Sequence, residues 1–106
     1  MRSFNLPTHK YVIMKAIWNG EVIAESDDTI VIDKNHYFPH DTIKKEFFTK
    51  TATHTVCNWK GTASYYTIKV GESENPDAAW YYPAASPMAK SFENYVAFWK
   101  DVLVTE

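Results

Sequence analysis

Hydrophobic and polar residues alternate through much of the first third of the chain, the pattern of strands with one buried face. Two such runs, Tyr11–Trp18 and Glu21–Ser26, are joined by Asn19-Gly20. This dipeptide readily supplies the two positive φ angles of a type I′ turn. We therefore predict a β-hairpin here. Thr29–Ile32 alternates as a third strand after a further turn, so the opening third of the chain is expected to form an antiparallel meander.

The next segment changes character at a proline. Asp33-Lys34-Asn35 reads as a turn leading into a short Tyr37-Phe38 segment, which Pro39 stops. His40–Phe48 then places apolar residues on one side at helical spacing, with Asp41 in position to act as an N-cap. We predict a short helix of two turns there.

β-branched and aromatic residues dominate the middle of the chain. Lys50–Trp59 and Ala63–Val70 are predicted strands, and Gly61 between them permits a tight turn. Because successive side chains of a strand point to opposite faces, three residues of the second strand share one apolar face: Tyr66, Ile68 and Val70. Gly71–Asp77 is rich in acidic and turn-forming residues, and we predict an exposed loop.

The last third is less regular. Ala79–Tyr82 is a predicted strand, and a single helical turn is expected near Met88–Phe92. Tyr95–Trp99 fits helical spacing and also fits a buried strand, so the pattern leaves both open. The prediction is mainly β: a single compact antiparallel domain over residues 11–106 with one or two short helices, preceded by a flexible leader over residues 1–10.

Composition narrows the class of protein. The chain has 106 residues, of which 45% are hydrophobic and 16% aromatic, enough for one core whose rings pack inside, line a cavity or form an interface. A net charge of −2 with no basic run argues against nucleic acid or an anionic membrane as the main partner. No apolar run approaches the roughly 18–20 residues of a membrane span, and we expect a soluble, cytoplasmic protein.

One stretch, Thr55–Tyr66, gathers the reactive side chains. Cys57 is the single cysteine, which excludes an internal disulfide framework and a multi-cysteine zinc site. Two interpretations of Cys57 stay open: a nucleophile activated by the positive charge of Lys60 or His54, or a small buried hydrophobe. Lys60 could bind an anion, form a Schiff base if desolvated, or be a solvated turn lysine.

One other grouping, a pair of histidines, is weaker. His36 and His40 are four residues apart, but Pro39 breaks any helix that would align them for a metal. We therefore expect no metal site and no cofactor.

The order of the motifs WNGEVIAES, YFP, CNWKGTASY, AWYYP and YVAFW resembles the domain of unknown function 427 family, from about Lys15 to Val104. The resemblance implies a compact β fold with barrel-like sheets, similar to the beta-tent domains of methionine sulfoxide reductase B and of cereblon. In that fold Tyr95–Trp99 would be a strand. Those relatives commonly hold zinc with four cysteines, and this chain has one, so the resemblance carries no zinc site here.

Members of this family are sometimes labelled nucleotidyltransferases. Such enzymes hold divalent metal with carboxylates beside a Gly-Ser loop that binds phosphates. The paired carboxylates here, Asp27-Asp28, lie in a predicted turn with no Gly-Ser before them, and turn formation explains both.

Three functional hypotheses follow. The leading one is a small-molecule binding module whose aromatic pocket is built from Lys60, Tyr66, Trp80 and Tyr82, with Cys57 lining it. The second is an enzyme that uses Cys57 as a nucleophile, with Lys60 as a second candidate catalytic group. The third is a homodimer or protein-interaction module that uses surface aromatic residues.

Overall fold

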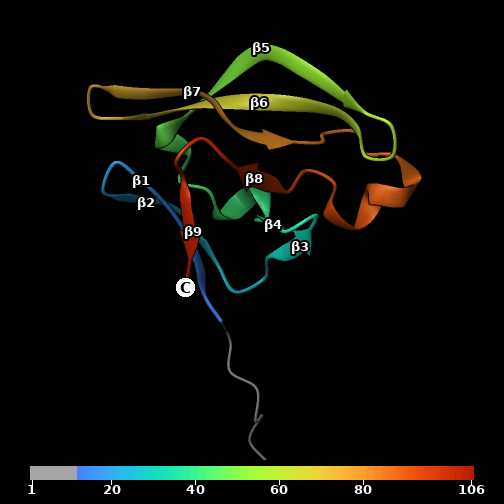
Figure 1. Cartoon of the computed structure of the whole chain (residues 1–106), viewed down its shortest axis with the longest axis horizontal. Coiled ribbons are helices and arrows are strands. Elements are labelled where there is room, and N and C mark those ends of the chain that lie inside the picture. The colour runs from blue at the N-terminus through green and yellow to red at the C-terminus, as the bar shows by residue number, and fades with distance from the viewer. Residues whose placement is uncertain (1–11) are drawn as a thin grey trace, which may run out of the picture.

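Three antiparallel sheets make up residues 12–106, the part of the chain that the computed structural model describes (Figure 1). The predicted leader, residues 1–10, and Tyr11 lie outside it. The first sheet has the order β2-β1-β9, with β1 Met14–Trp18, β2 Glu21–Ser26 and β9 Leu103–Thr105. The second pairs β3 Ile30–Ile32 with β4 Asn35–Tyr37. The third has the order β5-β6-β7-β8, with β5 Phe48–Cys57, β6 Gly61–Val70, β7 Ser73–Tyr81 and β8 Val96–Phe98. The prediction of a mainly β, single antiparallel domain is confirmed.

The predicted first hairpin is confirmed in its turn geometry. Asn19 and Gly20 have φ angles of 51° and 80°, the two positive values that a type I′ turn requires. β1 pairs with β2 on one side and with β9 on the other, so the end of the chain returns beside its beginning. Asp33 and Lys34 form the turn of the second hairpin in the same way, with φ angles of 51° and 70°.

The prediction of a continuous meander is wrong, because the two hairpins lie in separate sheets. The free edge of β2 is taken by a later segment instead of by β3. Ile43 forms an isolated bridge with Ala24, and the Lys44 amide donates a hydrogen bond of 2.8 Å to the Ile23 carbonyl. Long-range backbone pairing therefore replaces the local pairing that the alternating pattern suggested.

The same contact explains why the predicted helix over His40–Phe48 is wrong. The segment forms two separate 3-10 turns, η1 His40–Thr42 and η2 Lys45–Phe47, with Ile43 extended between them at φ −81° and ψ 146°. Asp41 makes no capping hydrogen bond. Burying Ile43 in the core and pairing it with β2 outweighs the modest helical preference of so short a segment.

The predicted exposed loop over Gly71–Asp77 is also wrong in extent. Only Gly71 and Glu72 form the turn, and β7 begins at Ser73, directly opposite Val70. The strand accommodates Pro76 at an irregularity where Thr67 of β6 faces extra residues of β7. Asp77, with φ 54°, completes this bulge. Of the acidic residues that suggested a loop, Glu72 and Glu74 are exposed near the end of the hairpin, whereas Asp77 is half-buried in the bulge.

The core divides into two clusters. The larger one fills the space between the first and third sheets and includes, as predicted, Tyr66, Ile68 and Val70. The smaller one is built from aromatic and alanine residues: Tyr37, Ala63, Tyr82, Ala85, Ala89, Phe92 and Ala97. The segment Tyr95–Trp99, for which the pattern left helix and strand open, contains the strand β8, and all three residues of β8 are buried. The helical turn expected near Met88–Phe92 is η3, Pro87–Phe92.

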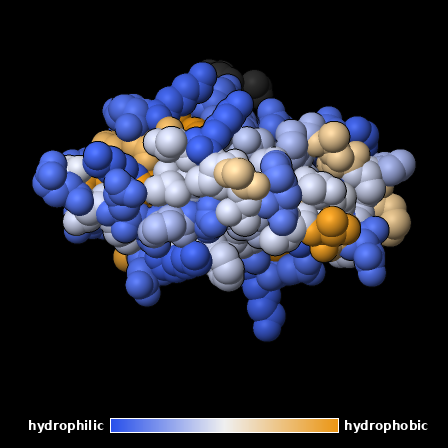
Figure 2. Space-filling view, turned by 90° about the horizontal axis from the view of Figure 1, so that it is seen from above, coloured by the Kyte–Doolittle hydropathy of each residue, from blue (hydrophilic) through white to orange (hydrophobic). Residues whose placement is uncertain are grey.

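The long strands β5, β6 and β7 arch over the rest of the molecule in Figure 1. Seen from above, this side is largely hydrophilic, with isolated hydrophobic residues (Figure 2). None of the helices in residues 12–106 is long and apolar enough to cross a membrane. The aromatic cluster under the end of the β5–β6 hairpin is the part of the fold that holds the candidate site.

Candidate functional site

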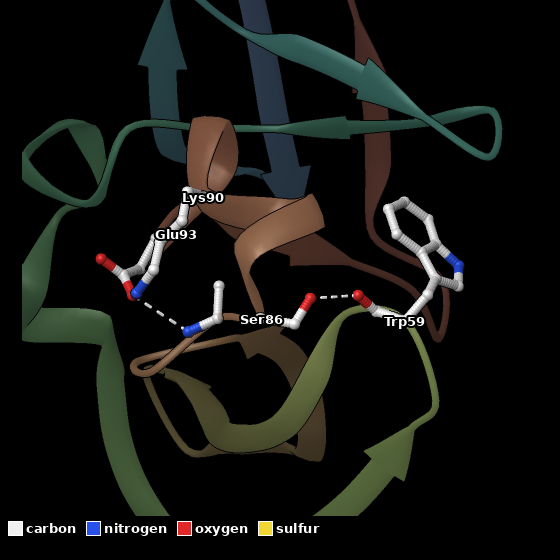
Figure 3. A network of polar contacts seen from close by, with 5 residues as sticks. Trp59, Ser86, Lys90 and Glu93 are labelled. Carbon is white, nitrogen blue, oxygen red and sulfur yellow. Dashed lines mark hydrogen bonds and ion pairs between the residues drawn. The ribbon is translucent and has the colours of Figure 1, made fainter.

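The turn between β5 and β6 is fixed by a loop from elsewhere in the chain. The Ser86 amide donates a hydrogen bond of 3.0 Å to the Lys60 carbonyl, and the Ser86 hydroxyl donates to the Trp59 carbonyl (Figure 3). Gly61 has φ 116°, and a Cβ there would lie 3.2 Å from the carbonyl oxygen of Ala84. Glycine therefore serves two needs at this position, the backbone angle and the close approach.

A carboxylate holds that loop in place. Glu93 accepts a hydrogen bond of 3.0 Å from the Ala85 amide and forms an ion pair of 2.6 Å with Lys90 (Figure 3). The hydrogen bond from Lys90, with that from the Ala85 amide, holds the pKa of the Glu93 carboxyl below its usual range. The loop after β7 is thus held at Ala85 and Ser86, and it fixes the backbone that carries Lys60.

Lys60 is the chemically distinctive residue of the site, because its side chain is only 9% exposed and carries a charge. Its ammonium forms an ion pair of 2.8 Å with Asp33 and donates a hydrogen bond of 3.2 Å to the Tyr37 hydroxyl. It also lies 5.2 Å from the ring centre of Trp59 and 6.0 Å from that of Tyr82, within the range of cation–π attraction. A charge this buried is stable only with such partners.

These partners determine the protonation state of Lys60. Burial by itself would lower the pKa of the ammonium, but the hydrogen bonds to Asp33 and Tyr37 more than offset burial and raise the pKa to about 12. The amine is therefore protonated at neutral pH. Schiff-base formation requires a neutral amine, so this geometry favours ionic recognition over covalent chemistry.

Tyr37 organises the site although it is fully buried. Its hydroxyl oxygen accepts two hydrogen bonds of 3.2 Å, one from the Lys60 ammonium and one from the indole N–H of Trp80. The Tyr37 and Trp80 rings meet edge to face with centres 6.1 Å apart. The hydroxyl fixes both the lysine and the tryptophan relative to each other.

A cavity of about 180 Å³ opens beside this cluster. Its lining is one lysine and four aromatic residues: Lys60, Tyr65, Trp80, Tyr82 and Trp99. Several polar tips of these rings are already bound to protein groups. The Trp99 indole donates a hydrogen bond of 2.6 Å to the Asp77 carbonyl, and the Tyr65 hydroxyl lies 2.9 Å from that of Thr55. Mainly ring surface is therefore left for a ligand.

Two polar groups remain available in the cavity. A lysine ammonium has three N–H donors, and among residues 12–106 Lys60 uses two of them, for Asp33 and Tyr37. The Tyr82 hydroxyl makes no hydrogen bond to any described residue. Every fully buried side-chain oxygen in residues 12–106 has a hydrogen-bond partner, so the Tyr82 hydroxyl must be accessible to solvent. Burial raises the pKa of Tyr82 to about 12, which keeps the hydroxyl neutral and able to donate.

The structure brings together three of the four residues predicted to bind a ligand, Lys60, Trp80 and Tyr82. Tyr66 is not among them. It points from β6 into the larger core cluster, where its hydroxyl lies 2.8 Å from Nε2 of His40 and its ring stacks on Tyr81 at 4.8 Å.

Tyr65 occupies the place that was predicted for Tyr66, because neighbouring residues of a strand face opposite ways. The alternation of Tyr66, Ile68 and Val70 was the signal that could have identified Tyr65. Asp33, Tyr37 and Trp99 were also missed. They come from separate elements, and no sequence spacing connects them to Lys60.

Cys57 packs against the aromatic cluster and is half-buried. His54 directs Nδ1 toward the Ala63 carbonyl at 3.3 Å and the Ser64 hydroxyl at 3.4 Å. In the described part of the chain, no hydrogen bond joins Cys57 to His54 or to Lys60, whose charge is held by Asp33. The cation that would activate a thiolate nucleophile is therefore engaged elsewhere.

The histidines considered for metal binding form hydrogen bonds with different protein groups. His36 lies 2.9 Å from the Thr29 hydroxyl, and Nδ1 of His40 donates to the Asn94 carbonyl at 2.7 Å. Within residues 12–106, no three His, Cys, Asp or Glu side chains are placed so that they could hold a metal ion.

A protein-family model described as "Domain of unknown function (DUF427)" matches residues 7–106. The match includes every residue of the cavity. No curated protein matches the chain.

Proposed function

Since the chain belongs to this family, whose description names no activity, we propose a function from the chain's own geometry: it binds a small, flat molecule in the aromatic cavity beside Lys60. The single observation that carries the proposal is a buried, protonated lysine with an unused N–H donor in the wall of a cavity otherwise lined by rings. A pocket with an apolar lining and a few convergent polar groups is typical of small-molecule sites.

The size and lining of the cavity define the ligand's body. A volume of about 180 Å³ is below the roughly 300–1,000 Å³ of pockets that hold drug-sized molecules, so the ligand is small. Trp80 and Trp99 meet edge to face with ring centres 6.0 Å apart. Their exposed ring surface suits a flat, unsaturated or aromatic group, which gains from stacking as well as from burial.

The free polar groups define the ligand's recognition element. Both the Lys60 N–H and the Tyr82 hydroxyl donate, so the matching group on the ligand accepts hydrogen bonds. An acceptor placed between them would satisfy the third donor of the ammonium. A ligand without such a group would leave that donor unpaired after water is displaced, which is unfavourable.

We propose that this module acts in the cytoplasm on a small molecule and not on nucleic acid or a membrane, consistent with a net charge of −2. The enzyme hypothesis has no comparable support, because Cys57 lacks a bonded charge partner among the described residues. The interaction-module hypothesis relied on surface aromatic residues, and Trp99, which is 48% exposed, already lines the proposed cavity.

Native mass spectrometry of protein purified from its own host tests the proposal directly, because it reports a retained ligand and the oligomeric state together. Fragment binding followed by two-dimensional NMR adds the location. We expect flat acceptor-bearing fragments to shift the indole N–H signals of Trp80 and Trp99.

Tyr82→Phe removes one hydrogen-bond donor and leaves the ring. The affinity for a flat, acceptor-bearing fragment should therefore fall about threefold to tenfold, the value of one hydrogen bond. Tyr81→Phe is the matched control, because Tyr81 directly precedes Tyr82 in the chain and packs in the other cluster. Equal affinities of the two variants and the unmodified protein would contradict this site.

A further inference from the structure

We propose that the acceptor group of the ligand is a carboxylate, which takes the unused N–H of the Lys60 ammonium and displaces the Asp33 carboxylate from it. The inference rests on the proposed function and specifies its ligand class. The Asp33 carboxylate lies 2.8 Å from the Lys60 ammonium. It is the only anionic group among residues 12–106 that forms an ion pair with this buried cation.

The two partners of this ion pair are buried to very different degrees. The Asp33 side chain is 61% exposed, whereas that of Lys60 is 9% exposed. Asp33 can therefore exchange the ammonium for water at small cost, as exposed members of ion pairs do. The Lys60 ammonium has no such alternative, because a buried charge without a counter-ion is strongly unfavourable. Any group that displaces Asp33 must itself be an anion.

The charge balance of the site leads to the same ligand class. Lys60 and Asp33 together are neutral, so an anion that entered beside both would place one uncompensated negative charge in a largely apolar cavity. An anion that takes the place of Asp33 leaves the charge of the site unchanged. A carboxylate also reproduces the acceptor geometry that Asp33 already presents to the ammonium.

Asp33 is carried by an element that can yield. It lies in the turn of the β3–β4 hairpin, whose two strands of three residues each, Ile30–Ile32 and Asn35–Tyr37, form a sheet of their own. β4 is held at its far end, where Phe38 pairs with Val96 of β8, so the turn that carries Asp33 is the end of the hairpin that no strand pairing holds among the described residues. The hairpin lies toward the same end of the molecule as the β5–β6 turn in Figure 1.

The turn residues are also unfavourable for their backbone conformation. Asp33 and Lys34 both have positive φ, at 51° and 70°, where non-glycine residues are uncommon. The first hairpin of the same chain meets the same requirement with Asn19-Gly20. Aspartate is tolerated in this conformation but lysine is not favoured there, so Lys34 makes this turn weaker than the first one.

Benzoate and benzamide test the inference, because they share a ring and differ in charge. We expect Asp33→Ala to lower the melting temperature, since Lys60 loses its counter-ion. Benzoate should then raise the melting temperature of the variant more than that of the unmodified protein, and bind it about fivefold or more tightly. Benzamide should show no such preference. Glu74→Ala, which removes an exposed carboxylate near the start of β7 and away from the cavity, should leave the benzoate affinity unchanged.

Two further variants test the same inference if Asp33→Ala does not fold. Asp33→Asn keeps the shape of the side chain and removes its charge, and it should show the same preference for benzoate. Lys60→Met in the Asp33→Asn background should abolish that preference.

The outcomes separate the inference from the proposed function. Benzoate binding equally to the unmodified protein and to both Asp33 variants would overturn the inference. So would benzamide matching benzoate in the variants while still shifting the indole signals of Trp80 and Trp99, but that result would leave the proposed function intact. Neither probe shifting those signals in any variant would contradict both.

Discussion

A Cβ on Gly61 would lie 3.2 Å from the carbonyl oxygen of Ala84, closer than ordinary van der Waals contact. The loop after β7 and the turn between β5 and β6 are therefore packed backbone against backbone. Since the same turn carries Lys60, its position depends on a residue with no side chain. This relationship leads to the first prediction.

Gly61→Ala should destabilise the protein more than Gly20→Ala. Gly20 also has a positive φ, of 80°, but nothing lies within 4 Å of its added Cβ, so only backbone strain of about 1 kcal/mol is expected. At Gly61, with φ 116°, displacement of Ala84 adds to the strain, and we expect a loss of about 2–4 kcal/mol. Chemical denaturation of both variants measures the difference. Equal losses would show that the loop yields without cost.

Lys34→Gly should stabilise the β3–β4 turn. Lys34 has φ 70°, a conformation that costs an L-residue about 1 kcal/mol and glycine very little. The larger freedom of glycine in the unfolded chain offsets part of this gain, so we expect an increase of about 0.5 kcal/mol in the free energy of unfolding. Lys69→Gly, at an exposed strand position, is the control and should be destabilising. A decrease for Lys34→Gly would mean that its side chain contributes more than the backbone strain costs.

Asp77 joins β5 to the bulge of β7, and Asp77→Asn should weaken this connection. The carboxylate accepts hydrogen bonds of 2.7 and 2.8 Å from the hydroxyls of Thr51 and Thr53. An amide can accept only one of them well, so we expect a loss of about 1–2 kcal/mol. Asparagine tolerates the φ of 54° at this position, which keeps the backbone comparable.

The same variant should alter the dependence of stability on acid. The hydrogen bonds from Thr51 and Thr53 hold the pKa of Asp77 below its usual value of 3.8. The ionised Asp77 carboxylate therefore stabilises the fold fully above pH 3.8, and this stabilisation is lost as the pH falls through the lowered pKa. The free energy of unfolding, measured at several pH values between neutral pH and strong acid, should decrease less for Asp77→Asn than for the unmodified protein. An equal decrease in the free energy of unfolding for the two proteins would contradict this role of Asp77.

Stability should fall between pH 10 and about 12. The folded protein raises the pKa of Lys60 from 10.5 to about 12, and burial raises those of Tyr66 and Tyr82 from 10.0 to about 12. In each case folding favours the protonated form. The stabilisation from each group is therefore complete below its ordinary pKa and is lost as the pH rises through its pKa in the folded protein. Urea midpoints at several alkaline pH values test this. The double variant Tyr66→Phe, Tyr82→Phe should show a shallower decline, and an unchanged slope would contradict it.

Cys57 should react slowly with alkylating agents at neutral pH in the folded protein. Its side chain packs against the aromatic cluster, and among the described residues no cation is hydrogen-bonded to it. Cys57→Ala should cost about 1 kcal/mol through lost packing. Comparison of alkylation rates before and after denaturation gives the measurement. Fast reaction of the folded protein that slows in Lys60→Met would promote the enzyme hypothesis.

Local patterns predicted the parts of this fold that depend on local physics. Asn19-Gly20 identified the first hairpin, because a type I′ turn needs two positive φ angles from adjacent residues. The alternation of Tyr66, Ile68 and Val70 identified the buried face of β6. The helix predicted over His40–Phe48 failed because Ile43 pairs with a strand some twenty residues earlier, and such pairing has no local signature.

The candidate site divides in the same way. Local patterns predicted that a lysine-glycine turn lies between two strands and that Trp80 lies on a later strand; Tyr82, predicted as the last residue of that strand, directly follows it. Long-range packing places Tyr65 and not Tyr66 at the cavity, and it brings Asp33 and Tyr37 from another hairpin to bind Lys60. No local pattern could show this, because a buried ammonium requires partners within hydrogen-bonding distance but does not specify which part of the chain provides them.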